Sequence, residues 1–293
     1  MNMPDLTGKI AIVTGANTGL GFETALGLYE SGAHVILACR TGEKAQQTRD
    51  RILSLAGKGS LETGILELAD LVAVKQFADR FLEKHRGLDL LINNAGVATP
   101  PASKTAQGIE LQFGVNFLGH FALTGYLYPA LERTKGSRVV TLSSMGYEGA
   151  SINFDNLRSE QGYDPLREYR QSKLANLLFS LELQRRITAK GGQVLSIAAQ
   201  PGANNTDLLR HATDEEVAAG RERIGSFMEP SQGALSSLYA AAAPEARGGN
   251  MYGPDQGFRG YPALTALKEI ALDESVAKKL WQVAEQITGI QYP

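Results

Sequence analysis

The first thirty residues constrain the fold most, because an apolar run, a glycine-rich turn and an amphipathic stretch follow one another there. The apolar run is Ile10 to Val13, the turn is Thr14 to Gly21, and the amphipathic stretch is Phe22 to Glu30. This order is typical of a strand, a loop and a helix in a parallel α/β unit. The sequence therefore predicts a first strand whose following loop can approach a ligand.

Short β-branched runs recur along the chain, separated by helical sequence, and they lack apolar/polar alternation. Such runs are typical of parallel strands that helices cover on both faces. We predict an α/β fold with one Rossmann-type, doubly wound parallel sheet flanked by helices, in a single domain over residues 1–293. Segments 203–230 and 244–265 are expected to be excursions that form a C-terminal substrate-binding lid. Further strands are expected at His34–Cys39, Leu88–Ile92, Arg138–Leu142 and Gln193–Ile197, with a weaker one at Leu61–Leu66.

The charge balance argues against nucleic acid and anionic membranes as partners. Lys and Arg total 29 and Asp and Glu total 31, a formal charge of −2, so no basic footprint is expected. No apolar run reaches the ~20 residues that span a bilayer, and the N-terminus lacks secretory-signal features. The single cysteine, Cys39, excludes an intramolecular disulfide and favours a reducing compartment. We therefore expect a cytoplasmic protein with a small-molecule partner.

The glycine-rich turn is a candidate phosphate-binding loop. Glycines permit a tight turn and let a pyrophosphate approach the backbone at a helix N-terminus. Such a turn also occurs for its geometry alone, but its place between the first strand and a helix favours a nucleotide. The residues expected to bind it are Gly15, Asn17, Thr18, Gly19, Leu20 and Gly21.

The end of the second strand indicates which cofactor is used. An Asp or Glu there would accept hydrogen bonds from the ribose hydroxyls of NAD, but this chain has Arg40. A guanidinium can pair with the 2′-phosphate of NADP, so NADP(H) is the predicted cofactor. The alternative is that Arg40 is only a solvated residue at a strand end.

A tyrosine and a lysine form the centre of the predicted chemistry. Tyr169 and Lys173 are four residues apart in a helical stretch, so both project from one face. A free phenol has a pKa of about 10, and work as an acid or base near neutrality requires lowering it by ~2–3 units, which a nearby cation can supply. The pair alone would also suit an ordinary amphipathic helix. Ser143 and Ser144 follow a strand, however, where a hydroxyl can hydrogen-bond a substrate oxygen.

These motifs follow a fixed order along nearly the whole chain, and here the chain resembles the short-chain dehydrogenase/reductase family, in the branch related to retinol dehydrogenases and carbonyl reductases. The resemblance rests on the turn from Thr14 to Gly21, Asn93-Asn94-Ala95-Gly96, Asn116, Ser144, Tyr169 with Lys173, and Pro201-Gly202 with Thr206.

The resemblance implies catalytic roles that agree with the physical interpretation. Tyr169 would transfer the proton, and Ser144, in preference to Ser143, would polarise the substrate oxygen. Lys173 would hold the ribose and tune Tyr169, and Asn116 would position a relay water.

The resemblance also implies cofactor contacts. Similar enzymes usually place Asp-Leu after the third strand, whereas this chain has Glu67-Leu68, which puts the adenine contact of Glu67 in doubt. The implied cofactor-binding residues are Glu67, Leu68, Asn93, Ala95, Gly96, Tyr169, Lys173, Pro201, Gly202 and Thr206.

The predicted function is NADP(H)-dependent hydride transfer between nicotinamide and a carbonyl/alcohol pair of a moderately hydrophobic small molecule. The alternatives are reduction of a conjugated carbon–carbon double bond by the same Tyr/Lys pair, and a non-catalytic NADP(H)-binding sensor. The apolar substrate is expected from residues of the lid segment, namely Leu208, Leu209, Ile224, Phe227 and Met228.

Two further expectations concern metals and assembly. Helices around 116–131 and 169–187 are apolar over much of their circumference, and in similar enzymes they form a subunit interface, so a homodimer or homotetramer is expected. The four histidines show no metal-ligand spacing, and no metal is predicted. They are His34, His85, His120 and His211.

Overall fold

The centre of the structure is a twisted sheet with the strand order β3-β2-β1-β4-β5-β6-β7-β8. The computed structural model describes residues 3–206, 215, 218, 222 and 225–293. Within them, β1 to β7 are parallel and β8 joins β7 antiparallel. The strands are β1 Ile10–Thr14, β2 His34–Cys39, β3 Ser60–Ile65, β4 Leu90–Asn93, β5 Arg138–Leu142, β6 Leu195–Ala199, β7 Met251–Pro254 and β8 Pro262–Leu264.

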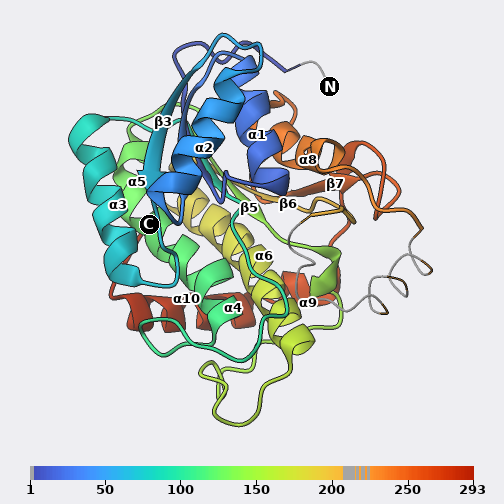
Figure 1. Cartoon of the computed structure of the whole chain (residues 1–293). Helices are drawn as coiled ribbons and strands as arrows, with labels where there is room; N and C mark the ends of the chain where they lie inside the picture. Colours follow the sequence, from blue (N-terminus) through green and yellow to red (C-terminus); the bar gives the residue numbers. More distant parts are fainter. Residues whose placement is uncertain (1–2, 207–214, 216–217, 219–221, 223–224) are drawn as a thin grey trace.

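Helices cover both faces of this sheet (Figure 1). One face packs against α1, α2 and α8, and the other against α3, α5 and α6, so each face has its own apolar core. The predicted doubly wound α/β fold is confirmed. The helices are α1 Gly19–Glu30, α2 Gly42–Leu53, α3 Leu71–Lys84, α4 Leu111–Phe113, α5 Gly119–Glu132, α6 Pro165–Ala189, α8 Pro230–Ala242, α9 Glu269–Leu272 and α10 Glu274–Thr288.

Helix α10 covers the outer side of α5 and α6. Trp281 of α10 is 1% exposed, and its ring centroid lies 4.9 Å from that of Phe121 and 5.9 Å from that of Phe179. The expectation of a dimer rests on the apolar character of α5 and α6. Packing against α10 of the same chain accounts for part of that character.

The C-terminal part of the sheet differs from expectation. Segment 244–265, expected to be a lid excursion, contains β7 and β8 and so extends the sheet. The β8 strand is three residues long and starts with Pro262, which suits an edge position because proline lacks the donor that a central strand needs. Its brevity leaves no periodic pattern in the sequence.

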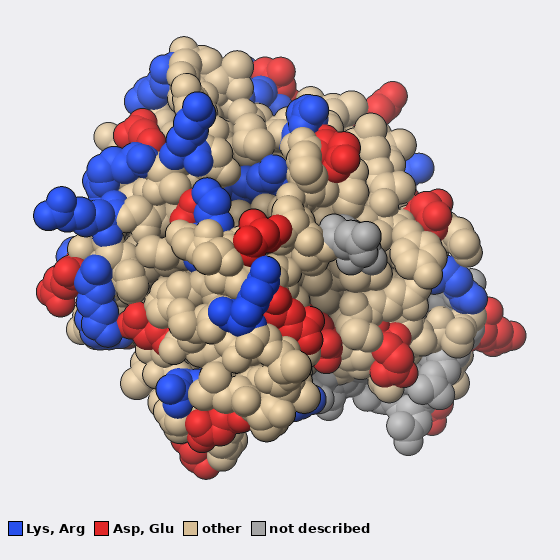
Figure 2. Space-filling model, turned by 90° about the horizontal axis from the view of Figure 1, so that it is seen from above, with Lys and Arg blue, Asp and Glu red and all other residues tan. Residues whose placement is uncertain are grey.

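The surface agrees with the balanced composition. Figure 2 shows Lys and Arg side chains together with Asp and Glu side chains over one face of the molecule. Among the described helices, none combines the length and the apolar character needed to cross a membrane.

Candidate functional site

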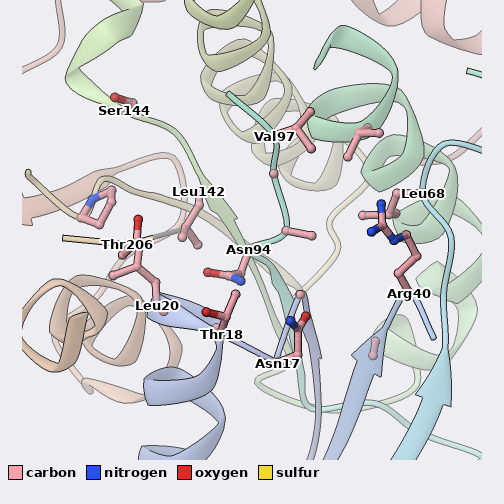
Figure 3. A pocket seen from close by; sticks show the side chains of 18 of the residues that line it. Asn17, Thr18, Leu20, Arg40, Leu68, Asn94, Val97, Leu142, Ser144 and Thr206 are labelled. Atoms are coloured by element: carbon pink, nitrogen blue, oxygen red, sulfur yellow. The ribbon is translucent and has the colours of Figure 1, made fainter. Parts of the chain in front are cut away.

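A cavity of about 650 Å³ lies at the carboxyl ends of the parallel strands. The loops after β1 to β6 each contribute residues to its lining, as expected where the loops of a parallel sheet converge. Figure 3 places Arg40 and Ser144 at opposite ends of this pocket, with Asn17 and Thr18 between them. The pocket is therefore elongated, with a different set of side chains at each end.

The loop between β1 and α1 forms the floor of the middle of the pocket. Gly15 has a φ of +66° and Gly19 a φ of +52°, and both lie in the left-handed region that favours glycine. Gly21 leaves no room for a side chain, because a Cβ would collide with the carbonyl oxygen of Gly15 and with Nδ2 of Asn94. The first turn of α1 therefore lies open to the cavity and offers backbone N–H groups to an anion.

Two cations lie at one end of the pocket. Arg40 follows β2, Lys44 lies in the first turn of α2, and both line the cavity with exposed side chains. The side chain of Thr41 caps α2 by accepting a hydrogen bond from the backbone N–H of Lys44 at 3.3 Å. Lys44 was not singled out from the sequence; its signal is a second basic residue four positions after Arg40 at a helix start.

Glu67, in doubt from the sequence, also lines the pocket. Its Oε1 accepts a hydrogen bond from the backbone N–H of Ala69 at 2.9 Å. This hydrogen bond keeps the Glu67 side chain, which is longer than the usual Asp, against its own loop. The carboxylate is therefore tied to the protein, and the neighbouring Leu68 offers an apolar surface.

Lys173 and Tyr169 lie together at the other end. Lys173 is 5% exposed, and its Nζ donates to the carbonyl oxygen of Leu142 at 3.4 Å. Burial lowers the pKa of Lys173 to about 8. The same Nζ lies 5.7 Å from the ring centroid of Tyr169.

The Tyr169 phenol is not activated by the chain alone. Burial raises its pKa above the usual 10, and a hydrogen bond with the side chain of Ser144 opposes that rise. The lowering of the Tyr169 pKa expected from Lys173 does not appear, since burial is the largest cause of the shift and Lys173 makes no resolved contribution to it. At neutral pH the phenol therefore keeps its proton.

Asn116 lies beside this cluster, behind the cavity wall. It is fully buried in a π-helical turn, Gly114–Leu118, between α4 and α5. Its Nδ2 donates to the carbonyl oxygen of Val97 at 3.0 Å and to Ser172 Oγ at 2.9 Å, and its Oδ1 accepts from the Val97 N–H at 2.8 Å. The side chain thus clamps the loop after β4 onto α6.

His120 joins Asn116 to the first strand. Its Nδ1 lies 2.9 Å from the Asn116 carbonyl oxygen, which only accepts, so Nδ1 carries the hydrogen. Burial lowers the pKa of His120 to about 4, so the ring is neutral and Nε2 accepts from the Thr14 hydroxyl at 2.8 Å. Thr14 Oγ1 in turn accepts from the N–H groups of Asn94 and Ala95, each at 2.9 Å. One buried network therefore fixes the ends of β1 and β4 and the Asn116 turn.

The start of the lid segment closes the Ser144 end of the pocket. Gly202, Asn204 and Thr206 line it, and the N–H of Met228 donates to the carbonyl oxygen of Ala203 at 2.8 Å. The proposed substrate contacts Leu208, Leu209 and Ile224 lie outside the described residues, as do His211 and most of the segment between 207 and 224.

The structure brings nearly all the predicted site residues to this cavity. Asn93 and Asn116 do not line it: Asn93 is 1% exposed and donates to Thr124 Oγ1 at 3.1 Å. Ser143, the serine not preferred from the sequence, lines the cavity as well. Besides Lys44, the lining includes residues that sequence reasoning did not name as catalytic or cofactor-binding, namely Ala38, Leu66, Ala69, Asn94, Val97, Leu111, Val115, Leu142 and Asn204. The predicted residues that do line it are Gly15, Asn17, Thr18, Gly19, Leu20, Gly21, Arg40, Glu67, Leu68, Ala95, Gly96, Ser144, Tyr169, Lys173, Pro201, Gly202 and Thr206.

The fold is a doubly wound α/β sheet with a pocket at the carboxyl ends of its parallel strands, and comparison with known proteins identifies its family. The model of the short chain dehydrogenase family matches residues 9–217. The chain belongs to this family, in its retinol dehydrogenase-like branch.

Two curated relatives illustrate the branch. Retinol dehydrogenase 14 of Mus musculus is 40% identical over 298 residues, covering 97% of this chain and 86% of the relative. Polyprenol dehydrogenase of Homo sapiens is 35% identical over 294 residues, covering 98% of this chain and 87% of the relative.

Solved structures share the fold. An uncharacterised protein from Mycobacterium paratuberculosis superposes with a TM-score of 0.83 at 38% identity, covering 100% of this chain and 97% of that one. A short chain dehydrogenase from Burkholderia cenocepacia in complex with NADP has a TM-score of 0.68 at 25% identity, covering 86% and 98%. These likenesses support a nicotinamide cofactor for this chain.

Proposed function

We propose that this protein catalyses the NADP(H)-dependent interconversion of a carbonyl compound and an alcohol, with Tyr169 as the proton donor or acceptor. The observation that carries the proposal is the elongated pocket itself. One end holds the Ser144 hydroxyl, the Tyr169 phenol and the Lys173 amine, and the other holds Arg40 and Lys44. This arrangement suits a dinucleotide whose reactive ring and 2′-phosphate lie far apart.

The residues present fit a nicotinamide dinucleotide. The close contact at Gly21 and the left-handed backbone at Gly15 and Gly19 leave the α1 N-terminus uncovered, which suits a pyrophosphate. A bound nicotinamide supplies or accepts the hydride. We assign the adenine end to Leu68 and Glu67, and the nicotinamide end to Pro201, Gly202 and Thr206, with Ala95 and Gly96 beside them. Asn93, which does not line the cavity, is assigned a supporting role behind these residues.

The chain's own groups handle the proton. Ser144 hydrogen-bonds Tyr169 and is placed to orient a substrate oxygen next to the phenol. Burial raises the pKa of Tyr169, so the phenol is protonated at neutral pH and is available as the proton donor that carbonyl reduction needs. Asn116, which clamps the loop after β4 to α6, is proposed to position a relay water.

Arg40 and Lys44 provide the argument for NADP(H) over NAD(H). Both lie at the ribose end, and a guanidinium can pair with a 2′-phosphate. We expect NADPH to bind more tightly than NADH in a fluorescence titration, and Arg40→Ala to remove about 1.5–3 kcal/mol of that preference. Lys44→Ala should remove a smaller part. Lys135→Ala, an exposed lysine elsewhere, is the control. Equal binding of the two nucleotides to the wild-type protein would refute this assignment.

An apolar alcohol or aldehyde is the proposed substrate class. The names of the relatives, retinol dehydrogenase and polyprenol dehydrogenase, point to long apolar alcohols. Met228 of the lid segment packs its buried apolar side chain beside Gly202, which lines the pocket. A screen of retinaldehyde, aliphatic aldehydes and ketones with NADPH, followed at 340 nm, tests this class.

The competing functions differ in their products. An enone reductase would consume the alkene of an enone and keep its carbonyl, whereas the proposed enzyme reduces the carbonyl and keeps the alkene. A sensor would bind NADPH without turnover of any carbonyl in the screen. The homodimer or homotetramer and the cytoplasmic location stay predictions, which light scattering and cell fractionation test.

A further inference from the structure

A second cluster of chemically reactive side chains lies at the opposite end of the sheet from the pocket. His34 begins β2, Glu62 lies near the start of β3, and His85 caps the C-terminus of α3. His34 lies two residues before Ile36 in β2, and Ile36 is paired with Glu62 of β3, so the three side chains share one face of the sheet. Ile36 belongs to the same apolar core as Phe77 and Phe81 of α3, so this is the face that α3 covers. Three elements that are distant in sequence thus place two imidazoles and one carboxylate together.

The three possible ligand atoms already lie close to the spacing of a metal site. His34 Nε2 and His85 Nε2 lie 3.6 Å and 3.1 Å from the same oxygen, Oε2 of Glu62, and all three atoms lie within 4.8 Å of one another. Zinc binds imidazole and carboxylate ligands at about 2.0–2.2 Å in tetrahedral geometry, which separates neighbouring ligand atoms by about 3.3–3.6 Å. Small side-chain rotations would bring the set to that geometry.

The ligand atoms are oriented by their neighbours. His34 Nδ1 lies 2.7 Å from Ser60 Oγ, and donation to this hydroxyl leaves the lone pair on Nε2. That Nε2 is buried and has no hydrogen-bond partner among the described residues. The His85 ring stacks on Phe81 at a centroid distance of 4.8 Å. Metal-ligating histidines characteristically donate their second ring N–H to a hydrogen-bond acceptor, as His34 Nδ1 does here.

The local charges suit a divalent cation with one opposing group. The last carbonyls of α3 present the negative end of the helix dipole at His85. Lys84 opposes a cation, since its Nζ contacts Glu62 Oε1 at 2.7 Å. The Lys84 side chain is 62% exposed, so it can turn into solvent. Lys84 contacts Oε1 of Glu62, whereas both histidines approach Oε2.

We infer that His34, Glu62 and His85 form a binding site for a single Zn²⁺ ion that ties β2, β3 and α3 together. Imidazole nitrogens select zinc and its transition-metal neighbours over Mg²⁺ and Ca²⁺, which prefer oxygen. The side chains are 16% to 29% exposed, so solvent reaches the cluster and water can fill the fourth position. Residue spacing alone contained no such signature, because 28 and 23 positions separate the ligands.

Calorimetric titration of the untagged, chelator-treated protein with ZnCl₂ tests the inference. We expect one saturable Zn²⁺ per chain and no comparable binding of MgCl₂. His34→Ala and His85→Ala should each weaken the affinity about tenfold or more, the lower limit known even for groups that only support a ligand. Zinc should also raise the Tm of the wild-type protein but not of either variant.

Two further variants keep the test decisive if a histidine variant folds poorly. Lys84→Ala retains all three ligands, removes the opposing cation, and should bind Zn²⁺ several-fold more tightly. Asp79→Asn alters a carboxylate of α3 that pairs with Lys75 and should leave the affinity unchanged. The inference would be overturned if the wild-type protein showed no saturable Zn²⁺ binding. It would also be overturned if Lys84→Ala, or both histidine variants, bound Zn²⁺ with the affinity of the wild-type protein.

Discussion

Replacing Lys173 with methionine tests how much the burial of its charged amine lowers the folding stability. Burial lowers the pKa of Lys173 from 10.5 to about 8, so between these values the unfolded chain binds a proton that the folded chain does not. Folding stability therefore carries a penalty that is complete below pH 8 and is relieved as the pH rises toward 10.5. Methionine retains a long apolar side chain of similar reach and removes the ionisable amine.

The magnitude follows from the pKa. Each unit corresponds to about 1.4 kcal/mol, so the wild-type penalty at pH 7 is at most about 3.4 kcal/mol and falls to about 1.4 kcal/mol at pH 9.5. The variant also loses the long hydrogen bond from Nζ to the Leu142 carbonyl oxygen, 3.4 Å, which offsets part of this gain. Lys173→Met is thus expected to be 1–3 kcal/mol more stable at pH 7 by this linkage, yet inactive.

Urea denaturation at several pH values between 7 and 9.5 measures the difference. The difference in unfolding free energy between Lys173→Met and wild type should shrink by about 2 kcal/mol across this range. Lys135→Met, which changes an exposed lysine, serves as the matched control and should show no such pH dependence. A variant that is no more stable than wild type at pH 7, or a gap that is constant with pH, would refute the reasoning.

Two other substitutions test the architecture of the pocket. His120→Phe removes the acceptor of the Thr14 hydroxyl and the donor to the Asn116 carbonyl oxygen, so we expect a loss of about 1–3 kcal/mol in urea denaturation; an unchanged midpoint would contradict the network. Gly21→Ala forces a Cβ against the Gly15 carbonyl oxygen, and NADPH titration should show binding lost in a protein that still folds; wild-type affinity would contradict the close packing of this turn.

The sequence predicted the parallel sheet well because its strands are short, apolar and buried on both faces. Runs such as His34–Cys39 and Arg138–Leu142 coincide with strands β2 and β5, since continuous burial leaves a continuous apolar pattern. β8 was missed because an edge strand that contains proline has no such pattern. The outward apolar faces of α5 and α6 were visible, but not that α10 of the same chain covers them.

The parts of the site that depend on local residue type and order could be predicted from the sequence. The parts that depend on packing between elements distant in sequence could not. The Tyr169 and Lys173 pair and the glycine turn are local, so their spacing already implied one face and one loop. The raised pKa of Tyr169 depends on burial, which no local pattern reveals. The cluster of His34, Glu62 and His85 forms only when three elements pack together.

The rate of NADPH oxidation with retinaldehyde, compared between wild type and Tyr169→Phe, tests the central claim most directly. Phenylalanine keeps the ring and removes the proton that the phenol would donate. We predict that wild type converts the aldehyde to the alcohol with one NADPH consumed per turnover. Tyr169→Phe should lower kcat by about 10²- to 10⁴-fold even when NADPH is saturating. Wild-type turnover that persists in Tyr169→Phe would contradict the account.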